Sequence, residues 1–539
     1  MNRFVQAIVS GMSGDPRAVA LVQGKRRLTH GEALEEVHRA ARGLAERGVR
    51  GGDAVVLLVG NTPEAVLYRV AAHLIGCCVA VLEPNAGGEV RAAVVRTLGP
   101  AALVVDPRYE EVAEDTLRHV EVPRVLTLGR AGLGEDLLPL VAGQSAAPVE
   151  PVAGECDRAM VMYTSGTGGE AKAACHTFSN LAEWLRMERS LRHPGPRRFL
   201  HHGSMNSVSA ENILWNLAAG GTTVLMEGGG PEEVLAAVEQ ERITYLLAYP
   251  TMLARLTAAC PAGGGLFPEL RQIQYGSAPA TTRLLREALA AFGPRLLGVY
   301  GSREAGFLTS LGCDEHSGEL LGSVGTPLPG VRVAVRTPED GAPVETGGTG
   351  EVWVRTPAAM TGYIGRAEGS SEGSADEGSD RGPDGSSPVF RDGWLRTGDL
   401  GRVDGTGRLH LMGRGDDVII VGGYNVHARE VEEALAEHPD VTWTAVVGVP
   451  EAAGGEAVHA AVVASPGSPV DAEALRSWVR TRLSTFHTPA SVRLVQRPLL
   501  TPRGKTDRRA VRALVRPSVP AVRDASAGGA SAAVGTEGA

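Results

Sequence analysis

Hydrophobic and polar positions follow helical and strand periodicities in turn over residues 28–84. Thr29 and Glu32 have the spacing of a capping box, ahead of a helix that we expect to run to about Arg47. The apolar run at 53–59 suits a buried strand, Asn61 follows at a turn, and Pro63 is placed to begin the next helix. The pattern therefore predicts strands and helices in alternation.

Three later apolar runs repeat the strand signal at residues 101–106, 222–226 and 245–249, with helical stretches between them. Such alternation is typical of an α/β fold with largely parallel strands. The chain from Arg414 onward has an α+β pattern of its own. We therefore predict a large N-terminal region of layered α/β sheets and a small, mobile α+β C-terminal domain.

The length of 539 residues exceeds what one hydrophobic core supports, which agrees with two domains. We predict a large domain at 1–412 and a small one at 413–515. Residues 365–388 are rich in glycine, serine and acidic residues, and we predict them, with a tail at 516–539, to be disordered. The segment 365–388 is either a solvated surface insertion or a regulatory segment.

Composition excludes several classes of protein. A net charge of −9 argues against a nucleic-acid partner held by bulk electrostatics. No apolar run reaches the roughly 18–20 residues that a membrane helix needs, and the N-terminus is too short and broken for a signal peptide. The six cysteines show neither a C-x-x-C pair nor metal-ligand spacing, as expected of free thiols in a reducing compartment. We expect a cytoplasmic protein with no nucleic-acid or membrane partner.

Lysine is scarce, although lysine and arginine together number 53. The chain holds only Lys25, Lys172 and Lys505. Lysine is a compact charge on a flexible stem, whereas arginine presents a planar fork, so a lysine in this background is expected where arginine cannot act. Lys172 and Lys505 both lie in glycine-rich stretches, which indicates an enzyme that handles nucleotide phosphates.

The first candidate site is the small-residue segment 164–169, which follows an apolar run and precedes Lys172. Backbone N–H groups of such a segment can converge on phosphate oxygens, and hydroxyls and a lysine add further donors. The order of a Walker A loop is missing. The alternative to a phosphate site is a plain strand-to-helix turn.

Two more segments carry chemistry. In 299–304 an apolar strand ends in Tyr300, Gly301 and then Glu304, which can place a base-stacking ring beside a Mg²⁺ ligand at a strand's carboxyl end. The alternative is a surface pair of Arg303 with Glu304. Asp399 lies in a glycine-flanked turn and is suited to accept both hydroxyls of a ribose, the alternative being an Asx-turn cap.

Together with the glycine-rich segments 413–417, 422–425 and 501–509, these patterns resemble the AMP-forming adenylating superfamily, which includes acyl-CoA synthetases, nonribosomal adenylation domains and luciferases. The resemblance covers about residues 25–515, and segments 27–32, 243–253, 275–279 and 322–330 add to it. It is nearest to fatty-acid and aryl-acid CoA ligases and to antibiotic-pathway amide ligases. It implies that a carboxylate attacks the α-phosphorus of ATP, that pyrophosphate leaves, and that a thiol or amine then displaces AMP.

The resemblance also implies roles for individual residues. The phosphate site would comprise Thr164, Ser165, Gly166, Thr167, Gly168, Gly169 and Lys172. The adenosine site would comprise Gly276, Ser277, Ala278, Tyr300, Gly301, Asp399 and Arg414. Lys505, Glu304 and Thr167 would be catalytic, with Glu304 placing Mg²⁺ and Lys505 bridging the carboxylate and the α-phosphate. Asp416 matches the hinge of the small domain.

Three departures from the family pattern bear on the substrates. Gly168, Ala171 and Ala173 replace a threonine, a proline and a glycine of the phosphate loop. Met205 and Asn206 stand where many relatives carry a histidine, and Arg303 stands where threonine is usual. The candidate residues of the acid pocket are Met205, Asn206, Tyr249, Tyr275, Ser302 and Phe307. Their mixture suits a medium aliphatic, cyclic or aryl acid.

The acceptor of the acyl group is left open between three classes. The glycine pair Gly422 and Gly423 and the likeness of segment 275–304 to CoA ligases favour coenzyme A. The divergent phosphate loop and the missing histidine fit an amide ligase that uses an amine, and a carrier-protein pantetheine is the third acceptor. A pseudo-enzyme is the alternative from another class, and Lys505, Asp399 and Glu304 together argue against it. The expected co-substrates are therefore ATP with Mg²⁺ and coenzyme A.

Overall fold

The computed structural model describes residues 2–164, 172–260, 267–338, 340–364, 389–421, 424–450, 456–501 and 504–515. The segments predicted to be disordered, 365–388 and 516–539, lie outside these residues. Two compact units divide the chain. Unit 1 is Met1–Val418 with Leu500–Thr506, and unit 2 is Ile419–Leu499 with Asp507–Ala539.

Unit 1 contains two large sheets built mainly from parallel strands. Within the described residues the first has the order β16-β15-β14-β13-β12-β10-β11-β1-β2. Its strands are β1 (Val19–Gln23), β2 (Arg26–Thr29), β10 (Arg198–His201), β11 (Thr222–Leu225), β12 (Tyr245–Ala248), β13 (Gln272–Gly276), β14 (Leu296–Ser302), β15 (Gly306–Leu311) and β16 (Thr326–Pro327). Its inner pairs are parallel, and β2, β15 and β16 are added at the edges in antiparallel fashion.

The second large sheet has the order β19-β9-β8-β4-β3-β5-β6-β7 in the described part of the chain. Its strands are β3 (Ala54–Leu58), β4 (Cys78–Val81), β5 (Ala102–Val105), β6 (Val125–Thr127), β7 (Glu135–Asp136), β8 (Arg158–Thr164), β9 (Lys172–Thr177) and β19 (Gly362–Tyr363). The strands β3 to β8 are parallel to one another, whereas β9 and β19 are antiparallel. The prediction of an α/β fold with largely parallel strands is confirmed.

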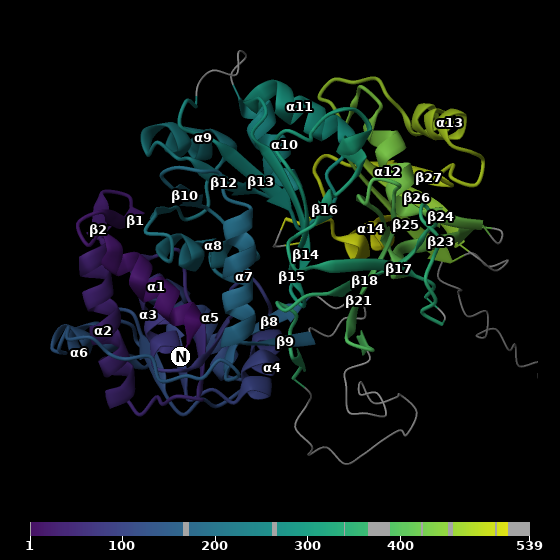
Figure 1. The fold of residues 1–539 in the computed structure, drawn as a ribbon. Coiled ribbons are helices and arrows are strands. Elements are labelled where there is room, and N and C mark those ends of the chain that lie inside the picture. Colours follow the sequence, from purple (N-terminus) through teal and green to yellow (C-terminus); the bar gives the residue numbers. More distant parts are fainter. Residues whose placement is uncertain are drawn as a thin grey trace, which may run out of the picture. The chain divides into compact units, whose positions relative to one another are not determined.

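The helices of unit 1 bury both sheets. They are α1 (Arg3–Gly14), α2 (His30–Glu46), α3 (Pro63–Leu74), α4 (Gly88–Leu98), α5 (Glu110–Leu117), α6 (Leu137–Ala142), α7 (Phe178–Ser190), α8 (Val208–Leu217), α9 (Pro231–Gln240), α10 (Pro250–Ala259) and α11 (Thr282–Phe292). Figure 1 shows α9, α10 and α11 on one side of the first sheet and α8 on the other. Helices α4 and α5 pack on the second sheet in a hydrophobic cluster separate from the main one.

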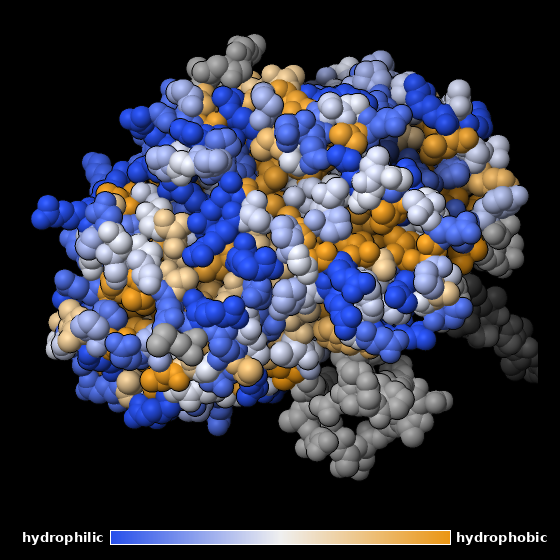
Figure 2. Space-filling model, viewed as in Figure 1, coloured by the Kyte–Doolittle hydropathy of each residue, from blue (hydrophilic) through white to orange (hydrophobic). Residues whose placement is uncertain are grey.

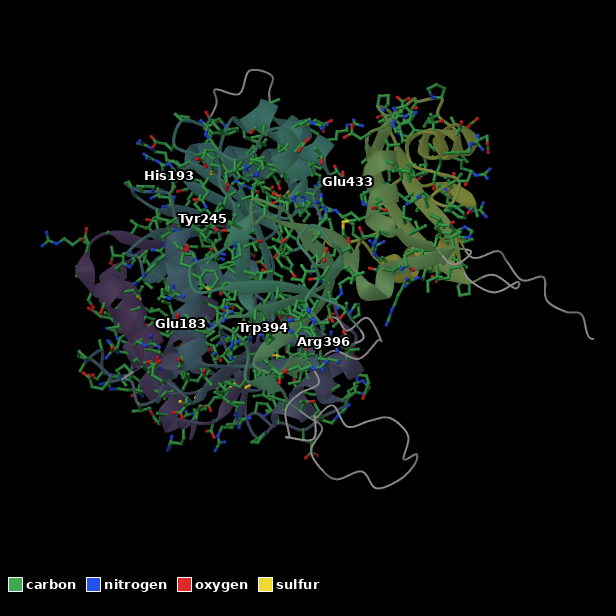
Figure 3. All side chains as sticks on the ribbon, turned by 45° about the vertical axis from the view of Figure 1, so that its right-hand side comes forward. Glu183, His193, Tyr245, Trp394, Arg396 and Glu433 are labelled. Atoms are coloured by element: carbon green, nitrogen blue, oxygen red, sulfur yellow. The ribbon has the colours of Figure 1, made fainter. Side chains whose placement is uncertain are left out.

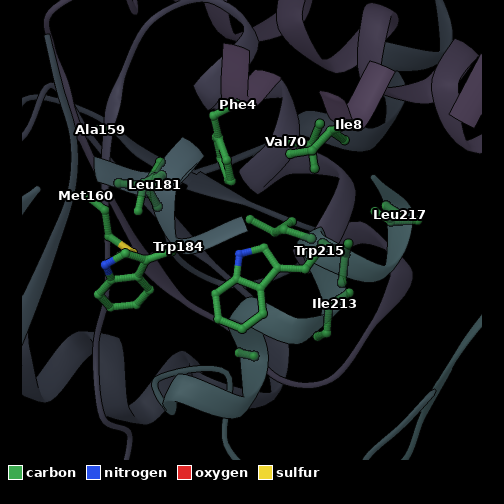
Figure 4. Close-up of a cluster of buried hydrophobic side chains, with 14 of the residues drawn as sticks. Phe4, Ile8, Val70, Ala159, Met160, Leu181, Trp184, Ile213, Trp215 and Leu217 are labelled. Carbon is green, nitrogen blue, oxygen red and sulfur yellow. The ribbon is translucent and has the colours of Figure 1, made fainter. Parts of the chain in front are cut away.

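The main hydrophobic cluster of unit 1 joins α1, α2, α3, α7 and α8 to both sheets. Figure 4 shows a part of this cluster, with labelled side chains from α1, α3, β8, α7 and α8. At its centre the rings of Trp184 and Trp215 lie 6.3 Å apart edge to face, and both side chains are buried. Phe4 and Ile8 of α1 pack into the same cluster. Aromatic side chains bury large areas and dominate core energetics, so this cluster fixes the helices between the sheets.

The local predictions near the N-terminus agree with the structure. Thr29 and Glu32 form a capping box, and α2 runs from His30 to Glu46. The apolar run at 53–59 is β3, and Pro63 occupies the first turn of α3. The later runs form β5, β11 and β12.

Smaller sheets complete the chain. Unit 1 also holds β17 (Arg332–Arg336), β18 (Gly350–Arg355), β20 (Phe390–Arg391), β21 (Trp394–Val403) and β22 (Leu409–Arg414). Unit 2 holds most of β23 (Val418–Val421), then β24 (Tyr424–His427), β25 (Val441–Pro450), β26 (Glu456–Ala464), β27 (Ser491–Leu494) and the helices α12 (Ala428–Ala436), α13 (Ala472–Arg482) and α14 (Arg508–Val515). The two compact units divide after Val418, and β22, which pairs with β21, belongs to unit 1.

The surface is of mixed polarity. On the face shown in Figure 2, hydrophilic and hydrophobic residues are intermingled. In unit 2, the exposed rings of Tyr424 and Phe486 stack with their centroids 3.9 Å apart.

Over the described residues, no helix has both the length and the apolar character needed to span a membrane.

Candidate active site

The predicted site residues gather where neighbouring parallel strands of the first sheet end. Met205 and Asn206 follow β10, Tyr249 follows β12, and Gly276 closes β13. Ser302 ends β14, the next strand. Because parallel strands have their carboxyl ends at the same edge of a sheet, these positions share one edge, where sites of α/β proteins form.

The backbone at the end of β13 is specialised for close approach. A side chain at Gly276 would place its Cβ 2.2 Å from the carbonyl oxygen of Val299 on β14, so only glycine fits. Ser277 follows with φ of 66°, a left-handed conformation that is uncommon outside glycine. The sequence-predicted adenine segment is therefore a strained turn held against β14, and strain of this kind clusters at binding sites.

Tyr300, Asp399 and Arg414 form a hydrogen-bonded group. The Tyr300 hydroxyl donates to Asp399 Oδ2 at 2.6 Å, and Arg414 Nη1 lies 3.3 Å from Asp399 Oδ1. Asp399 and Arg414 are opposite each other in the antiparallel pair of β21 and β22. Trp394 and Arg396, which are labelled in Figure 3, lie on β21, the strand that also carries Asp399. Three of the seven predicted adenosine-site residues are thus brought together.

Burial and hydrogen bonding shift the pKa of the Asp399 carboxyl in opposite directions. Burial raises the pKa of the Asp399 carboxyl above its ordinary value, and the Arg414 charge and the Tyr300 hydroxyl partly offset that rise. Burial, with the Asp399 charge second, raises the pKa of the Tyr300 hydroxyl well above its ordinary value, so this group stays a donor. A carboxylate with two aligned donors and 17% of its side-chain surface exposed can exchange a donor for a ligand hydroxyl.

Glu304 is held by a residue that the sequence did not single out. The Tyr363 hydroxyl donates to Glu304 Oε1 at 3.0 Å, and the Lys172 ammonium lies 5.3 Å from the centre of the Tyr363 ring. Tyr363 is on β19, which pairs with β9 beside Lys172. No local signal marks Tyr363, because its partners are far away along the chain.

A magnesium ion fits Glu304 only with help from a ligand. Within the described residues, no three His, Cys, Asp or Glu side chains come together as a metal site. Mg²⁺ commonly binds through one or two carboxylates together with substrate phosphates and water. The donor set around Glu304 is of this kind, because one carboxylate is linked through Tyr363 to Lys172, a residue of the predicted phosphate site.

Arg303 does not pair with Glu304. Its Nη1 donates to the carbonyl of Tyr163 at the end of β8, and its Nη2 donates to the carbonyl of Asn206 at 3.1 Å. The surface Arg303–Glu304 pair considered from the sequence is therefore wrong. Arg303 instead joins the strand that precedes the phosphate segment to the segment that follows β10.

The phosphate segment joins two strands and not a strand and a helix. Thr164 ends β8 and is opposite Lys172, the first residue of the antiparallel strand β9. The strand-to-helix turn considered from the sequence is therefore wrong, because the stretch after the glycines forms a hairpin partner of β8. Ser165, Gly166, Thr167, Gly168 and Gly169 lie outside the described residues.

Three of the six candidate acid-pocket residues belong to two different hydrophobic clusters. Met205 and Phe307 are buried in the main cluster, where the Phe307 ring lies 5.4 Å from that of Trp215. Tyr275 instead lies in the cluster beneath α10 and α11, and its hydroxyl is 3.0 Å from His316 Nε2. The Ser302 hydroxyl accepts from the Ala305 N–H at 3.2 Å. Met205 and Phe307 thus belong to one hydrophobic cluster and Tyr275 to another.

The segment that carries Lys505 groups with unit 1. The Thr251 hydroxyl, in the first turn of α10, donates to the Gly504 carbonyl at 3.1 Å. Thr501 N–H donates to the Lys505 carbonyl at 2.7 Å and closes the turn, while the Lys505 side chain is exposed. Asp416 lies in the short 3₁₀ turn Gly415–Asp417, and Gly422 and Gly423 lie outside the described residues.

Known proteins are similar to this chain over most of its length. The family model described as AMP-binding enzyme matches residues 11–364, and that of the AMP-binding enzyme C-terminal domain matches residues 430–505. A feruloyl-CoA synthase from an Amycolatopsis species is 33% identical over 91% of this chain and 94% of its own. A medium/long-chain-fatty-acid–CoA ligase, FadD8, from Mycobacterium tuberculosis is 31% identical over 94% and 89%.

A solved structure is also similar over nearly the whole chain. The amide bond synthetase McbA from Marinactinospora thermotolerans superposes with a TM-score of 0.85 at 36% identity, covering 95% of this chain and 100% of McbA.

Proposed function

The chain belongs to the AMP-binding enzyme family, and from that membership we propose that it joins a carboxylic acid to AMP and then transfers the acyl group to coenzyme A. A carboxylate oxygen attacks the α-phosphorus of ATP, the bond to the β-phosphate breaks, and pyrophosphate leaves. The thiol sulfur of coenzyme A then attacks the acyl carbonyl, the thiol proton is released, and AMP leaves. The observation that carries this proposal is the Tyr300–Asp399–Arg414 group at the edge where the parallel strands end.

In this proposal the ribose, the adenine and the phosphates of ATP each have binding residues. Asp399 accepts hydroxyl protons of the ribose, and Tyr300 with the segment Gly276–Ala278 flanks the adenine. Glu304 would help to bind Mg²⁺, together with ATP and water. Thr164, Thr167 and Lys172 bind the phosphates. Lys505 stabilises the charge that builds up between the carboxylate and the α-phosphate, as positioned cations do in other group transfers.

The acceptor is proposed from the relatives. The Amycolatopsis and Mycobacterium proteins are named as ligases that use coenzyme A, and both match about nine-tenths of this chain. An amine acceptor is the second candidate, because McbA, named as an amide bond synthetase, is 36% identical, somewhat more than either ligase. In that reaction the amine nitrogen attacks the acyl carbonyl and loses a proton as AMP leaves.

The test is a single reaction of purified protein, ATP, Mg²⁺ and a mixed carboxylic-acid library, with coenzyme A and a set of amines competing, read by mass spectrometry. A new CoA thioester is expected. Amides in place of thioesters would show that the acceptor is an amine. Acyl-adenylate without either product would point to a carrier-protein thiol. Absence of ATP-dependent product with every acid would overturn the adenylation proposal itself.

A lysine substitution tests the proposed catalysis. Lys505→Ala is expected to slow adenylate formation by ~10²–10³-fold, a typical loss for one stabilising contact, and to leave acyl transfer from a supplied acyl-adenylate nearly intact. ATP–pyrophosphate exchange reports the first step and thioester formation the second. Lys25→Ala, an exposed lysine between β1 and β2, is the matched control and should leave both steps unchanged. Equal loss of both steps in Lys505→Ala would contradict the assigned role.

A further inference from the structure

A buried ion pair lines a small cavity beside Met205 in unit 1. Arg69 comes from α3 and Glu211 from α8, and Arg69 Nη2 lies 2.7 and 2.8 Å from the two carboxylate oxygens of Glu211. Only 2% and 4% of the two side chains are exposed. The remaining wall is mainly apolar and includes Val79, Val81 and Met160.

This pair is poorly explained as a device for stability. Removing two charges from water costs free energy that their attraction repays only with good geometry and further hydrogen bonds. Arg69 Nε has no hydrogen-bond partner in the described part of the protein, so a buried donor lacks an acceptor. A mostly apolar wall with a few directed polar groups is instead the usual composition of a pocket for a small molecule.

The cavity adjoins the acid site proposed above. Met205 and Asn206, both predicted from the sequence to contact the acid, belong to its wall. Met160 and Met162 also line it, so three methionines surround the ion pair. Methionine is unbranched and flexible, and such side chains rearrange readily to admit a ligand.

We propose that Arg69 and Glu211 select the acid substrate by binding a neutral hydrogen-bond acceptor, such as a hydroxyl, ether or carbonyl oxygen, at the end of the acid remote from its carboxylate. The inference rests on the proposed adenylation. The unpartnered Arg69 Nε supplies the donor. The pair has no net charge, so a second carboxylate or an ammonium at that end of the acid meets no balancing charge and is disfavoured. An acid with a purely apolar end leaves Arg69 Nε without an acceptor.

The test uses ATP–pyrophosphate exchange with matched acids that differ only at the remote end, as methyl, hydroxyl, carboxylate or aminomethyl, on aryl and on aliphatic scaffolds. In the unaltered protein we expect kcat/KM for the hydroxyl member to exceed that for the methyl member by roughly 10–100-fold, the range of one directed hydrogen bond. The double variant R69M/E211L keeps the volume with apolar groups, a replacement that buried ion pairs often tolerate, and should abolish or invert the preference. A preference for methyl, carboxylate or aminomethyl in the unaltered protein would overturn the inference, as would an unchanged ratio in the double variant.

Two further variants control for folding. Ile213→Val on α8 is buried but does not line the cavity, and should keep the wild-type preference. Glu211→Gln retains a partner for Arg69 yet leaves its charge unbalanced, so preference should shift toward the carboxylate member, and the absence of that shift would contradict the proposal. Melting temperatures show which variants fold. Exchange with none of the acids in the unaltered protein marks failure of the proposed adenylation, whereas exchange led by the methyl acids marks failure of this inference alone.

Discussion

Opposing effects act on the carboxyl of Asp399, the residue that we propose as the acceptor for the ribose hydroxyls. Burial raises the pKa of its carboxyl, and Arg414 and Tyr300 act against that rise. A carboxyl whose pKa is raised on folding contributes stability below its unfolded pKa, and that stability is lost as pH rises through the folded value. Protonation of Asp399 at acid pH therefore removes an acceptor without unfolding the protein.

A pH profile of Tyr300→Phe tests this view of Asp399. The kcat/KM for ATP in pyrophosphate exchange is expected to fall as pH falls through the raised pKa of Asp399. Because the Tyr300 hydroxyl favours the ionised carboxylate, its removal should move that midpoint to higher pH. Circular dichroism at each pH verifies that the fold persists. Asp399→Asn should lower activity throughout and flatten this limb, and an unmoved midpoint in Tyr300→Phe would contradict the argument.

At the scale of elements, the turn between β14 and β15 ties the two large sheets together through Arg303. Its guanidinium reaches the carbonyl of Tyr163 at the end of β8 in the second sheet and that of Asn206 after β10 in the first. Tyr163 precedes the phosphate segment, and Asn206 adjoins the proposed acid pocket. One side chain therefore bonds next to both segments that we propose to bind substrates.

Arg303→Met should consequently raise KM for ATP and for the acid together. Loss of two charge-assisted hydrogen bonds should also lower the free energy of unfolding by about 1–3 kcal/mol. Initial-rate kinetics with each substrate varied and urea unfolding measure the two effects. Arg189→Met, at an exposed position on α7, is the control. A rise in one KM only would show that Arg303 holds a single segment.

The same elements show what the sequence could and could not predict. Local signals sufficed for α2, β3 and α3, because a capping box, an apolar run and a proline each act within a few residues. The hairpin of β8 and β9 was missed because a glycine-rich segment has the same composition before a strand as before a helix. The partners of Arg303, Tyr363 and Arg69 lie about 60 to 190 residues away along the chain, beyond the reach of any periodicity. Candidate site residues can be named from the sequence where a motif carries them, and not where only packing brings residues together.

At the scale of the whole molecule, the chain crosses between its two compact units three times. It leaves unit 1 after Val418, returns for Leu500–Thr506, and passes into unit 2 again at Asp507. Leu499 and Asp507, which flank the Lys505 segment, therefore belong to unit 2. Because both ends of that segment connect to unit 2, we expect the proposed rotation of unit 2 to be coupled to the position of Lys505.

This connectivity predicts that the two half-reactions can be separated at Asp416, the proposed hinge. Asp416 lies in the 3₁₀ turn Gly415–Asp417, whose φ values proline accepts, and it follows a glycine, which tolerates the restriction before proline. Asp416→Pro should therefore preserve the turn seen here and restrict the change in φ that a rotation requires. We expect pyrophosphate exchange within a few-fold of the unaltered protein and thioester formation slower by roughly tenfold or more, because conformational steps commonly limit such cycles.

Asp416→Ala, which leaves φ free, should retain both activities. Unimpaired thioester formation in Asp416→Pro would place the hinge elsewhere, with the division of the compact units after Val418 as the next position to restrict.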